Sequence, residues 1–244
     1  MTSYRDPTAS MAEVEAATAR LISTARKLTD AELREPSPLP RWTRGHVLTH
    51  VARNADGLRN LLIWAATGVE TPQYASPQAR HDDIYAGAGR PATEQVTDVE
   101  DSAARFAQAA TEVPEANWSN LVEMRGGLQI PAWEIFIRRL SEVEIHHVDL
   151  DAGYTPAHWP AEWVSRALAN IVDGLADREE FPKLVLHAED TDREFPVRPQ
   201  ASGPAITVAG PEPALMAWLI GRSSGDGLAV EPHGTALPPL PKWA

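Results

Sequence analysis

Two pairs of metal-ligating residue types stand four residues apart in this sequence. Glu142 and His146 belong to the segment SEVEIHHVDL, and His46 and His50 to RGHVLTHVARNA. On a helix, side chains four residues apart share one face, with Cβ atoms about 5–6 Å apart. Each pair could therefore direct two ligand atoms toward one divalent metal. Two histidines and one glutamate would form an open site, with a position left for water or substrate.

More ligand types are present than such a site needs. Spacing favours His50 over His46, because His50 lies one turn deeper in its helix and away from the exposed first turn. Glu144 and His147 share the face of Glu142 poorly. The alternative is that these residues are ordinary polar side chains that hydrogen-bond one another. Two pairs on separate helices of one bundle favour a metal site, because facing helices build such sites in bundle cores.

The same sequence predicts the helices that would carry these residues. Apolar residues at three- and four-residue spacing predict helices over residues 9–28, 44–67, 93–113 and 131–149. Thr43 and Gly68 have the residue types of an N-cap and a terminator for the second of these, and Pro131 suits a helix start. We expect a short helix within the Pro- and Gly-rich residues 71–91 and a hairpin around residues 125–127.

The composition changes after Gly153, where PAHWP resembles a linker. A further set of shorter elements follows: helices over residues 161–177 and 212–221, and strands over 184–188, 194–197, 206–209 and 228–230. A Pro-rich tail then contains Trp243, a candidate packing residue. We predict an α+β protein, with a four-helix bundle in residues 1–155 and a small α+β domain with a short antiparallel sheet in residues 156–244.

Composition excludes several function classes. The chain has 244 residues, no cysteine and a formal net charge of −12. This charge argues against nucleic acid or an anionic membrane as a partner. The first residues lack the pattern of a signal peptide, and no apolar run has the length of a membrane span, so we expect a cytoplasmic protein. Without cysteine, any thiol chemistry must use a thiol supplied from outside.

Two arginines could hold an anionic substrate. Arg80 lies in the segment SPQAR and Arg222 in GRSSGDG. The alternative is a solvated surface arginine, but a guanidinium binds a carboxylate in a planar, two-pronged geometry that lysine cannot provide. A phosphate-binding loop around Arg222 is not favoured, because no lysine or helix follows it. Trp42 and Trp64, close to the second helix, could line a pocket.

At these residues the chain resembles the mycothiol-dependent maleylpyruvate isomerases of the DinB-like metal-binding superfamily. The resemblance runs in order through WTRGHVLTHVARNADGLRNLLIWAATGVETPQYASPQAR, SEVEIHHVDL and GRSSGDG and covers nearly the whole chain. It implies a DinB-like four-helix bundle followed by a smaller α+β domain. It also implies zinc ligation by His50, Glu142 and His146, with Arg80 and Arg222 as substrate contacts.

This sequence departs from the family pattern at two places. His147 follows His146 where a small residue is expected, and the Gly-rich segment after Arg222 is one residue longer. The resemblance implies conversion of maleylpyruvate to fumarylpyruvate in gentisate breakdown. The cofactors would be zinc and a low-molecular-weight thiol, with mycothiol expected; glutathione and ergothioneine are alternatives. The partners would then be a small dicarboxylate and a small thiol. Alternative functions are a thiol S-transferase acting on electrophiles and a zinc-binding regulator.

Overall fold

The computed structural model describes residues 7–242, and these form two compact units. The first unit extends to Tyr154 and the second begins at Thr155. Independent folding of the two units as domains stays a prediction. Residues 1–6 and Trp243 lie outside the described residues. The expectation about a signal peptide rests in part on the former, and the expected packing role rests on Trp243.

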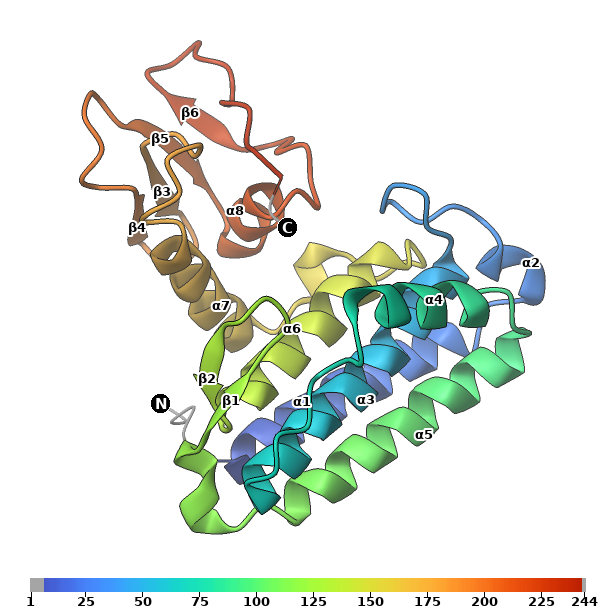
Figure 1. Ribbon diagram of the computed structural model, residues 1–244. Helices are drawn as coiled ribbons and strands as arrows, with labels where there is room; N and C mark the ends of the chain where they lie inside the picture. Colours follow the sequence, from blue (N-terminus) through green and yellow to red (C-terminus); the bar gives the residue numbers. More distant parts are fainter. Residues whose placement is uncertain (1–6, 243–244) are drawn as a thin grey trace. The chain divides into compact units, whose positions relative to one another are not determined.

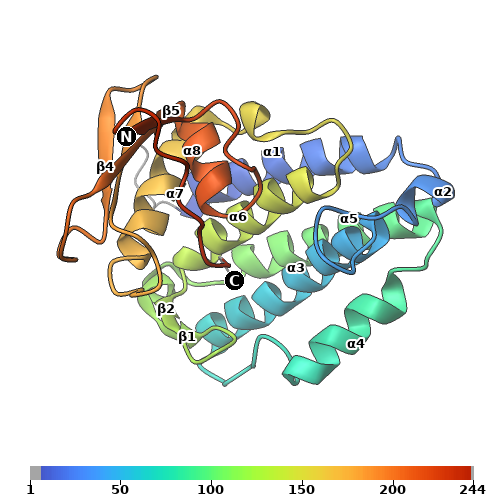
Figure 2. The same ribbon diagram turned by 90° about the horizontal axis from the view of Figure 1, so that it is seen from above.

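The first unit is a bundle of four long helices (Figure 1). These are α1 (Pro7–Ala25), α3 (Arg44–Thr67), α5 (Ala92–Thr111) and α6 (Glu134–Asp149). Helix α3 packs against α5 and α6, and α1 packs against α6 and α5. The shorter helix α4 (Pro77–Gly87) also packs on α3 and lies on the outside of the bundle (Figure 2). The bundle therefore places α3 beside α6, the two helices that carry the candidate ligands.

Helix α3 begins and ends where the sequence predicts. The Thr43 side chain accepts a hydrogen bond from the backbone N–H of His46 (3.4 Å), and His46 Nδ1 accepts one from the backbone N–H of Thr43 (3.2 Å). This reciprocal pair is a capping box. At the other end, Gly68 has φ of 74°, a left-handed conformation that glycine adopts without strain. Between these caps the inward face of α3 is buried, including Leu58 and Leu61.

Helix α6 begins later than predicted. Pro131 is the last residue of β2 (Gln129–Pro131), which pairs antiparallel with β1 (Leu121–Glu123) to form the hairpin expected around residues 125–127. The first helical residue is therefore Glu134. Proline is compatible with a strand end as well as with a helix start, so the residue type alone could not distinguish them. The sequence also gave no periodic signal for the four-residue helix α2 (Asp30–Leu33) or the 3₁₀ helix Glu115–Ser119.

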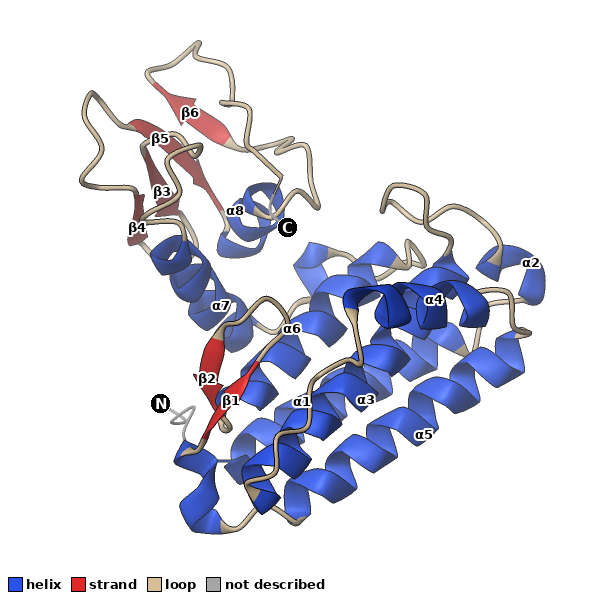
Figure 3. Ribbon diagram, in the orientation of Figure 1, coloured by secondary structure: helices blue, strands red, loops and turns tan. Residues whose placement is uncertain are grey.

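The second unit is a small α+β fold whose strands are short (Figure 3). Its helices are the 3₁₀ helix Pro156–His158, α7 (Ala161–Gly174) and α8 (Glu212–Leu219). Its strands are β3 (Leu184–Ala188), β4 (Arg193–Val197), β5 (Ile206–Gly210) and β6 (Ala229–Glu231). Helix α7 packs against α8 and against β4, and α8 also packs on β3 and β5. The helices therefore cover the sheet and bury its apolar side chains.

The sheet of this unit is mixed rather than antiparallel throughout. Its strand order is β4-β3-β5-β6, and the central pair, β3 with β5, is parallel. Strand β4 ends at Val197 opposite Leu184, and Ile206 begins β5 opposite the same residue. The connection from β4 to β5 therefore passes the first residue of β3 and stays at that end of the sheet. Strand β5 then runs antiparallel to β4, in the same direction as β3. Strand spacing along a sequence does not contain this information.

Within residues 7–242, no helix combines the length and the apolar character needed to span a membrane.

Candidate metal centre

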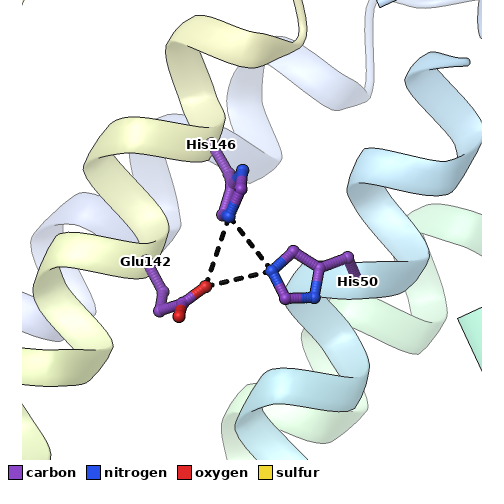
Figure 4. Close-up of side chains that lie close together, drawn as sticks. All are labelled: His50, Glu142 and His146. Atoms are coloured by element: carbon purple, nitrogen blue, oxygen red, sulfur yellow. Dashed lines mark hydrogen bonds and ion pairs between the residues drawn. The ribbon is translucent and has the colours of Figure 1, made fainter. Parts of the chain in front are cut away.

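Three side chains from two helices converge on one point in the bundle. His50 comes from α3, and Glu142 and His146 come from α6 (Figure 4). His50 Nε2 lies 3.0 Å from Glu142 Oε2 and 3.0 Å from His146 Nε2, and the latter two atoms are 3.3 Å apart. The three potential ligand atoms thus form a small triangle of two nitrogens and one oxygen. These are the residues that the resemblance implies as zinc ligands, and the structure brings them together.

The ring nitrogens that face this point are fixed by contacts on the opposite side of each ring. Asp149, which is 1% exposed, has its Oδ2 2.8 Å from His146 Nδ1. For His50 of α3, the contact comes from Arg80 of α4, whose Nη2 lies 3.2 Å from His50 Nδ1. Such contacts hold an imidazole in one orientation and leave its other nitrogen directed at the site. Arg80, a predicted substrate contact, therefore lies directly beside the cluster.

The three groups also set one another's protonation. Burial and the neighbouring His146 charge lower the pKa of His50 to about 4. Burial also opposes the charge on His146, but hydrogen bonds to Asp149 and Glu142 raise its pKa to about 9. For Glu142, hydrogen bonds to both imidazoles outweigh burial and hold the carboxyl pKa well below its usual value. Near neutral pH the cluster therefore contains a neutral His50, a protonated His146 and an ionised Glu142.

His46 serves a different purpose from His50. Its Nδ1 accepts the N-cap hydrogen bond from Thr43, so that nitrogen is committed to the start of α3. Its ring stacks on Trp42 (6.2 Å between centroids) and meets the edge of Tyr85 (4.7 Å). Trp42 in turn lies edge-on to His50, with ring centroids 5.4 Å apart. The preference for His50 over His46, which spacing already indicated, is therefore explained by a capping role for His46.

Glu144 and His147 lie on the α1 side of α6. Arg20 Nη2 donates to Glu144 Oε1 (2.5 Å), and the Tyr154 hydroxyl donates to Glu144 Oε2 (2.6 Å). The His147 ring stacks on Tyr154 at 3.7 Å, and its Nε2 is hydrogen-bonded to Thr24 Oγ1 (2.7 Å). Both residues are 1% exposed. They join α6 to α1 and do not contribute to the triangle.

Sequence reasoning missed two residues that support the site, Asp149 and Arg139. Asp149 follows His146 by three residues, and this spacing could have indicated a contact on one helix face. Arg139 precedes Glu142 by three residues and is 1% exposed. Its Nη1 donates to Val51 O (2.8 Å) and Asn54 Oδ1 (2.9 Å) of α3. Arginine is rarely fully buried in a bundle core, so residue type and spacing offered no reason to select Arg139.

Arg222, the second predicted substrate contact, belongs to the second unit. Its backbone N–H donates to Ala217 O (2.7 Å), and its Nη1 donates to Ile220 O (3.1 Å). Gly221, immediately before it, has φ of 72°. The turn after α8 therefore fixes the backbone at Arg222 through contacts within the same unit.

A helical bundle whose facing helices direct two imidazoles and a carboxylate at one point defines a protein of the bundle class with a candidate metal site. The family model "Mycothiol maleylpyruvate isomerase N-terminal domain" matches residues 14–151, and "MDMPI C-terminal domain" matches residues 158–238. The chain therefore belongs to the mycothiol maleylpyruvate isomerase family, and the prediction of an isomerase enzyme is confirmed.

The solved structures agree with this assignment. The chain is similar to the crystal structure of the mycothiol-dependent maleylpyruvate isomerase, with 31% identity and a TM-score of 0.90. The match covers 98% of this chain and 100% of that one. A histidine-to-alanine mutant of the mycothiol-dependent maleylpyruvate isomerase matches with the same values. No curated protein matched the sequence significantly. Predicted family and fold class are thus confirmed.

Proposed function

We propose that this chain is a zinc- and thiol-dependent cis–trans isomerase that converts maleylpyruvate to fumarylpyruvate. The observation that carries the proposal is the convergence of His50, Glu142 and His146 on one point, 3.0–3.3 Å apart. Support for the substrate and the thiol comes from the family and from the names of its solved relatives. A place in gentisate breakdown and a cytoplasmic location stay predictions from the sequence.

The donor set fits zinc. Catalytic zinc sites commonly use three protein ligands drawn from His and Glu, at about 2.0–2.2 Å from the metal. Tetrahedral ligands at that distance lie about 3.3–3.6 Å from one another, and the atoms of the triangle are slightly closer together than this. His50, Glu142 and His146 would hold the metal and leave a fourth position open. A metal there would supply a Lewis acid that keeps a bound thiol deprotonated near neutral pH.

The reaction needs a nucleophile because rotation about a carbon–carbon double bond is too slow without one. A thiolate bound there would supply this nucleophile: its addition to the conjugated double bond, with the electron pair moving onto the carbonyl oxygen, would leave a single bond about which rotation is fast. Return of that electron pair would restore the double bond in the trans geometry and release the thiolate. With no cysteine in the chain, the thiol must be a separate molecule.

Arg80 would bind a substrate carboxylate next to the cluster. A guanidinium has only donors, so the present contact requires a lone pair on His50 Nδ1. A neutral His50 that gave its Nε2 lone pair to a metal would carry its proton on Nδ1. Arg80 would then lose this acceptor, and its donors would be left for the substrate.

Dependence on added thiol tests the proposal directly. Zinc-loaded protein freed of small thiols should be inactive with maleylpyruvate, and mycothiol should restore formation of the trans product. Turnover without any thiol would contradict addition and elimination and would indicate a metal-bound hydroxide route. Accumulation of a thiol adduct without trans product would indicate the S-transferase instead.

Variants of the two arginines test the substrate contacts. Arg222→Ala should lower kcat/KM for maleylpyruvate by about 10²–10³, the scale for losing one contact to a developing oxyanion. Arg80→Ala should mainly raise KM, as for a contact equal in ground and transition states. Arg34→Ala, at an exposed position of the bundle, is the matched control and should leave the kinetics unchanged. Wild-type isomerase kinetics in Arg222→Ala would show that Arg222 does not contact the substrate.

A further inference from the structure

The first unit contains a cavity that the reaction described above does not use. It has a volume of about 200 Å³ and lies between the C-terminal end of α3, the segment leading to α4, and the β1–β2 hairpin. These segments lie side by side in both views of the molecule (Figures 1 and 2). Its lining includes two aromatic rings, Trp64 and Tyr74, and three charged side chains, Glu70, Glu123 and Arg125.

The walls of this cavity are held in place by contacts outside it. Gln73, which is 6% exposed, accepts a hydrogen bond at Oε1 from the backbone N–H of Arg125 (2.8 Å). Asn60 Nδ2 on α3 donates to Pro72 O (3.3 Å), which fixes the same segment to the helix. A Cβ at Gly57 would come within 2.9 Å of the Tyr74 ring, so glycine permits the ring to lie against α3. The cavity is therefore formed before any ligand arrives.

The polar groups of the cavity are available to a ligand. Among residues 7–242, the charged ends of Glu70, Glu123 and Arg125 form no hydrogen bond or ion pair with the protein. Burial raises the pKa of Tyr74, so its hydroxyl remains protonated and able to donate. The cavity thus offers donors, acceptors and aromatic faces together, the lining expected for a specific small-molecule site.

The charges exclude a dicarboxylate from this cavity. Two carboxylates and one guanidinium leave it with a net charge of −1, which would repel maleylpyruvate or an acidic thiol such as glutathione. A neutral ligand with many hydroxyl groups would meet no such repulsion. Its hydroxyls could donate to the carboxylates and accept from the guanidinium, while the C–H faces of its rings pack on Trp64 and Tyr74.

One arginine, Arg80, lies between the cavity and the candidate metal centre and contacts residues of both. The Arg80 guanidinium carbon lies 5.6 Å from the centre of the Tyr74 ring, and Arg80 Nη2 lies 3.2 Å from His50 Nδ1. A ligand whose sulfur reached the cluster could therefore place its remaining part in the cavity. The proposed function requires a thiol brought from outside, and so provides such a ligand.

We infer that this cavity binds the hydroxylated, uncharged part of the thiol cofactor, with Trp64 and Tyr74 as its stacking faces and Glu123 and Arg125 as its polar contacts. The inference rests on the proposed function only in assuming that the sulfur of the ligand reaches the candidate metal centre. Mycothiol, the thiol in the family name, fits this chemistry because it joins N-acetylcysteine to glucosaminyl inositol and is uncharged apart from its sulfur. The cavity would then select a sugar-bearing thiol over glutathione.

A binding measurement tests the cavity without any turnover. The full chain, loaded with zinc, is titrated by calorimetry with N-acetylglucosaminyl inositol, which keeps the neutral, amide-bearing sugar part of mycothiol without its cysteine. We expect saturable binding that glutathione does not displace, and a loss of about tenfold or more in Trp64→Ala and in Glu123→Gln, the scale of one lost polar or stacking contact. Glu115→Gln, an exposed carboxylate outside the cavity, is the control for Glu123→Gln. No binding of the sugar probe would overturn the inference.

A kinetic measurement separates this inference from the proposed function. With mycothiol, Trp64→Ala and Glu123→Gln should raise the KM for the thiol about tenfold and leave kcat unchanged. With N-acetylcysteine, which has the sulfur but no sugar, the same variants should match the wild type. Equal effects on both thiols would overturn the cavity assignment while leaving the isomerase intact. If no thiol supports turnover, the proposed function fails, and the binding measurement still decides whether the cavity takes a sugar. Glu123→Gln provides the result if Trp64→Ala does not fold.

Discussion

Helix α6 presents a glutamate and a histidine on each of two faces, and only one face forms a candidate metal centre. Glu142 and His146 face α3, whereas Glu144 and His147 face α1. The residue types are the same, and both clusters lie in the same helix. The difference must therefore come from what the neighbouring helix provides.

On the α1 side, the neighbour provides a permanent cation. Arg20 and the Tyr154 hydroxyl both donate to Glu144, and this carboxylate is thereby neutralised and saturated. On the α3 side, Glu142 forms no ion pair with Arg or Lys among residues 7–242, and its partners are two imidazoles. An imidazole can lose its proton and bind a metal, whereas a guanidinium cannot. A carboxylate near a histidine therefore indicates a metal site only when the carboxylate is not already paired with an arginine or lysine.

The largest expected effect separates the two glutamates. Glu142→Gln should reduce bound zinc from one per chain to almost none, because an amide oxygen is a poor substitute for an anionic ligand. The loss should exceed the roughly 10–100-fold that follows from removing a supporting contact. Glu144→Gln is the matched control and should retain full zinc. Elemental analysis after equilibrium dialysis measures both, and equal losses in the two variants would remove the distinction between the faces.

The next effect concerns the residue behind His146. Asp149→Asn should weaken zinc binding about 10–100-fold, because the carboxylate orients the imidazole and makes it more basic. Competition with a chromogenic chelator measures the affinity. Asp151→Asn, an exposed aspartate just beyond the helix, is the control. Unchanged affinity in Asp149→Asn would mean that this contact serves folding alone.

The sequence predicted the positions of the candidate ligands better than their surroundings. Spacing places Glu142 and His146 on one face and predicts α3 to the residue, because caps and apolar periodicity are local properties. The convergence of His50 with that pair is a property of how α3 packs on α6. It followed from the resemblance and not from the spacing. The capping role of His46 was likewise not predicted, because it depends on a hydrogen bond with Thr43 that residue type alone did not reveal.

Other features could not be predicted because they depend on distant contacts. The start of α6 depends on Pro131 pairing with Leu121, ten residues earlier in a strand with no strong signal of its own. The parallel pairing of β3 with β5 depends on the path of a connection. Buried Arg139 is compatible with the core only because α3 supplies acceptors for it. Each of these is decided by tertiary structure.

A smaller effect is expected from pH. Without metal, His146 has a pKa of about 9 and His50 of about 4, so the cluster holds one proton between these values. Zinc must displace that proton from His146. Affinity should therefore rise about tenfold per pH unit between pH 5 and 8 and level off above about pH 9. Chelator competition at several pH values measures this, and an affinity independent of pH would show that His146 is not a ligand. Glu144→Gln should follow the wild-type profile.

The smallest effect should appear on the α1 face, in stability and not in metal binding. Arg20→Ala leaves the buried Glu144 carboxylate with the Tyr154 hydroxyl but without its cation. The Arg20 side chain is 40% exposed, so water can replace part of the lost interaction. We expect the metal-free protein to lose about 1–2 kcal/mol of unfolding free energy. The double variant Arg20→Ala, Glu144→Gln should recover part of this, because it also removes the carboxylate charge that Arg20 had faced. Denaturant unfolding measures the stability, and zinc affinity should stay at the wild-type value in both variants. A parallel fall in zinc affinity would show that the two faces of α6 are coupled, and the contrast between a structural and a metal-binding cluster would then no longer hold.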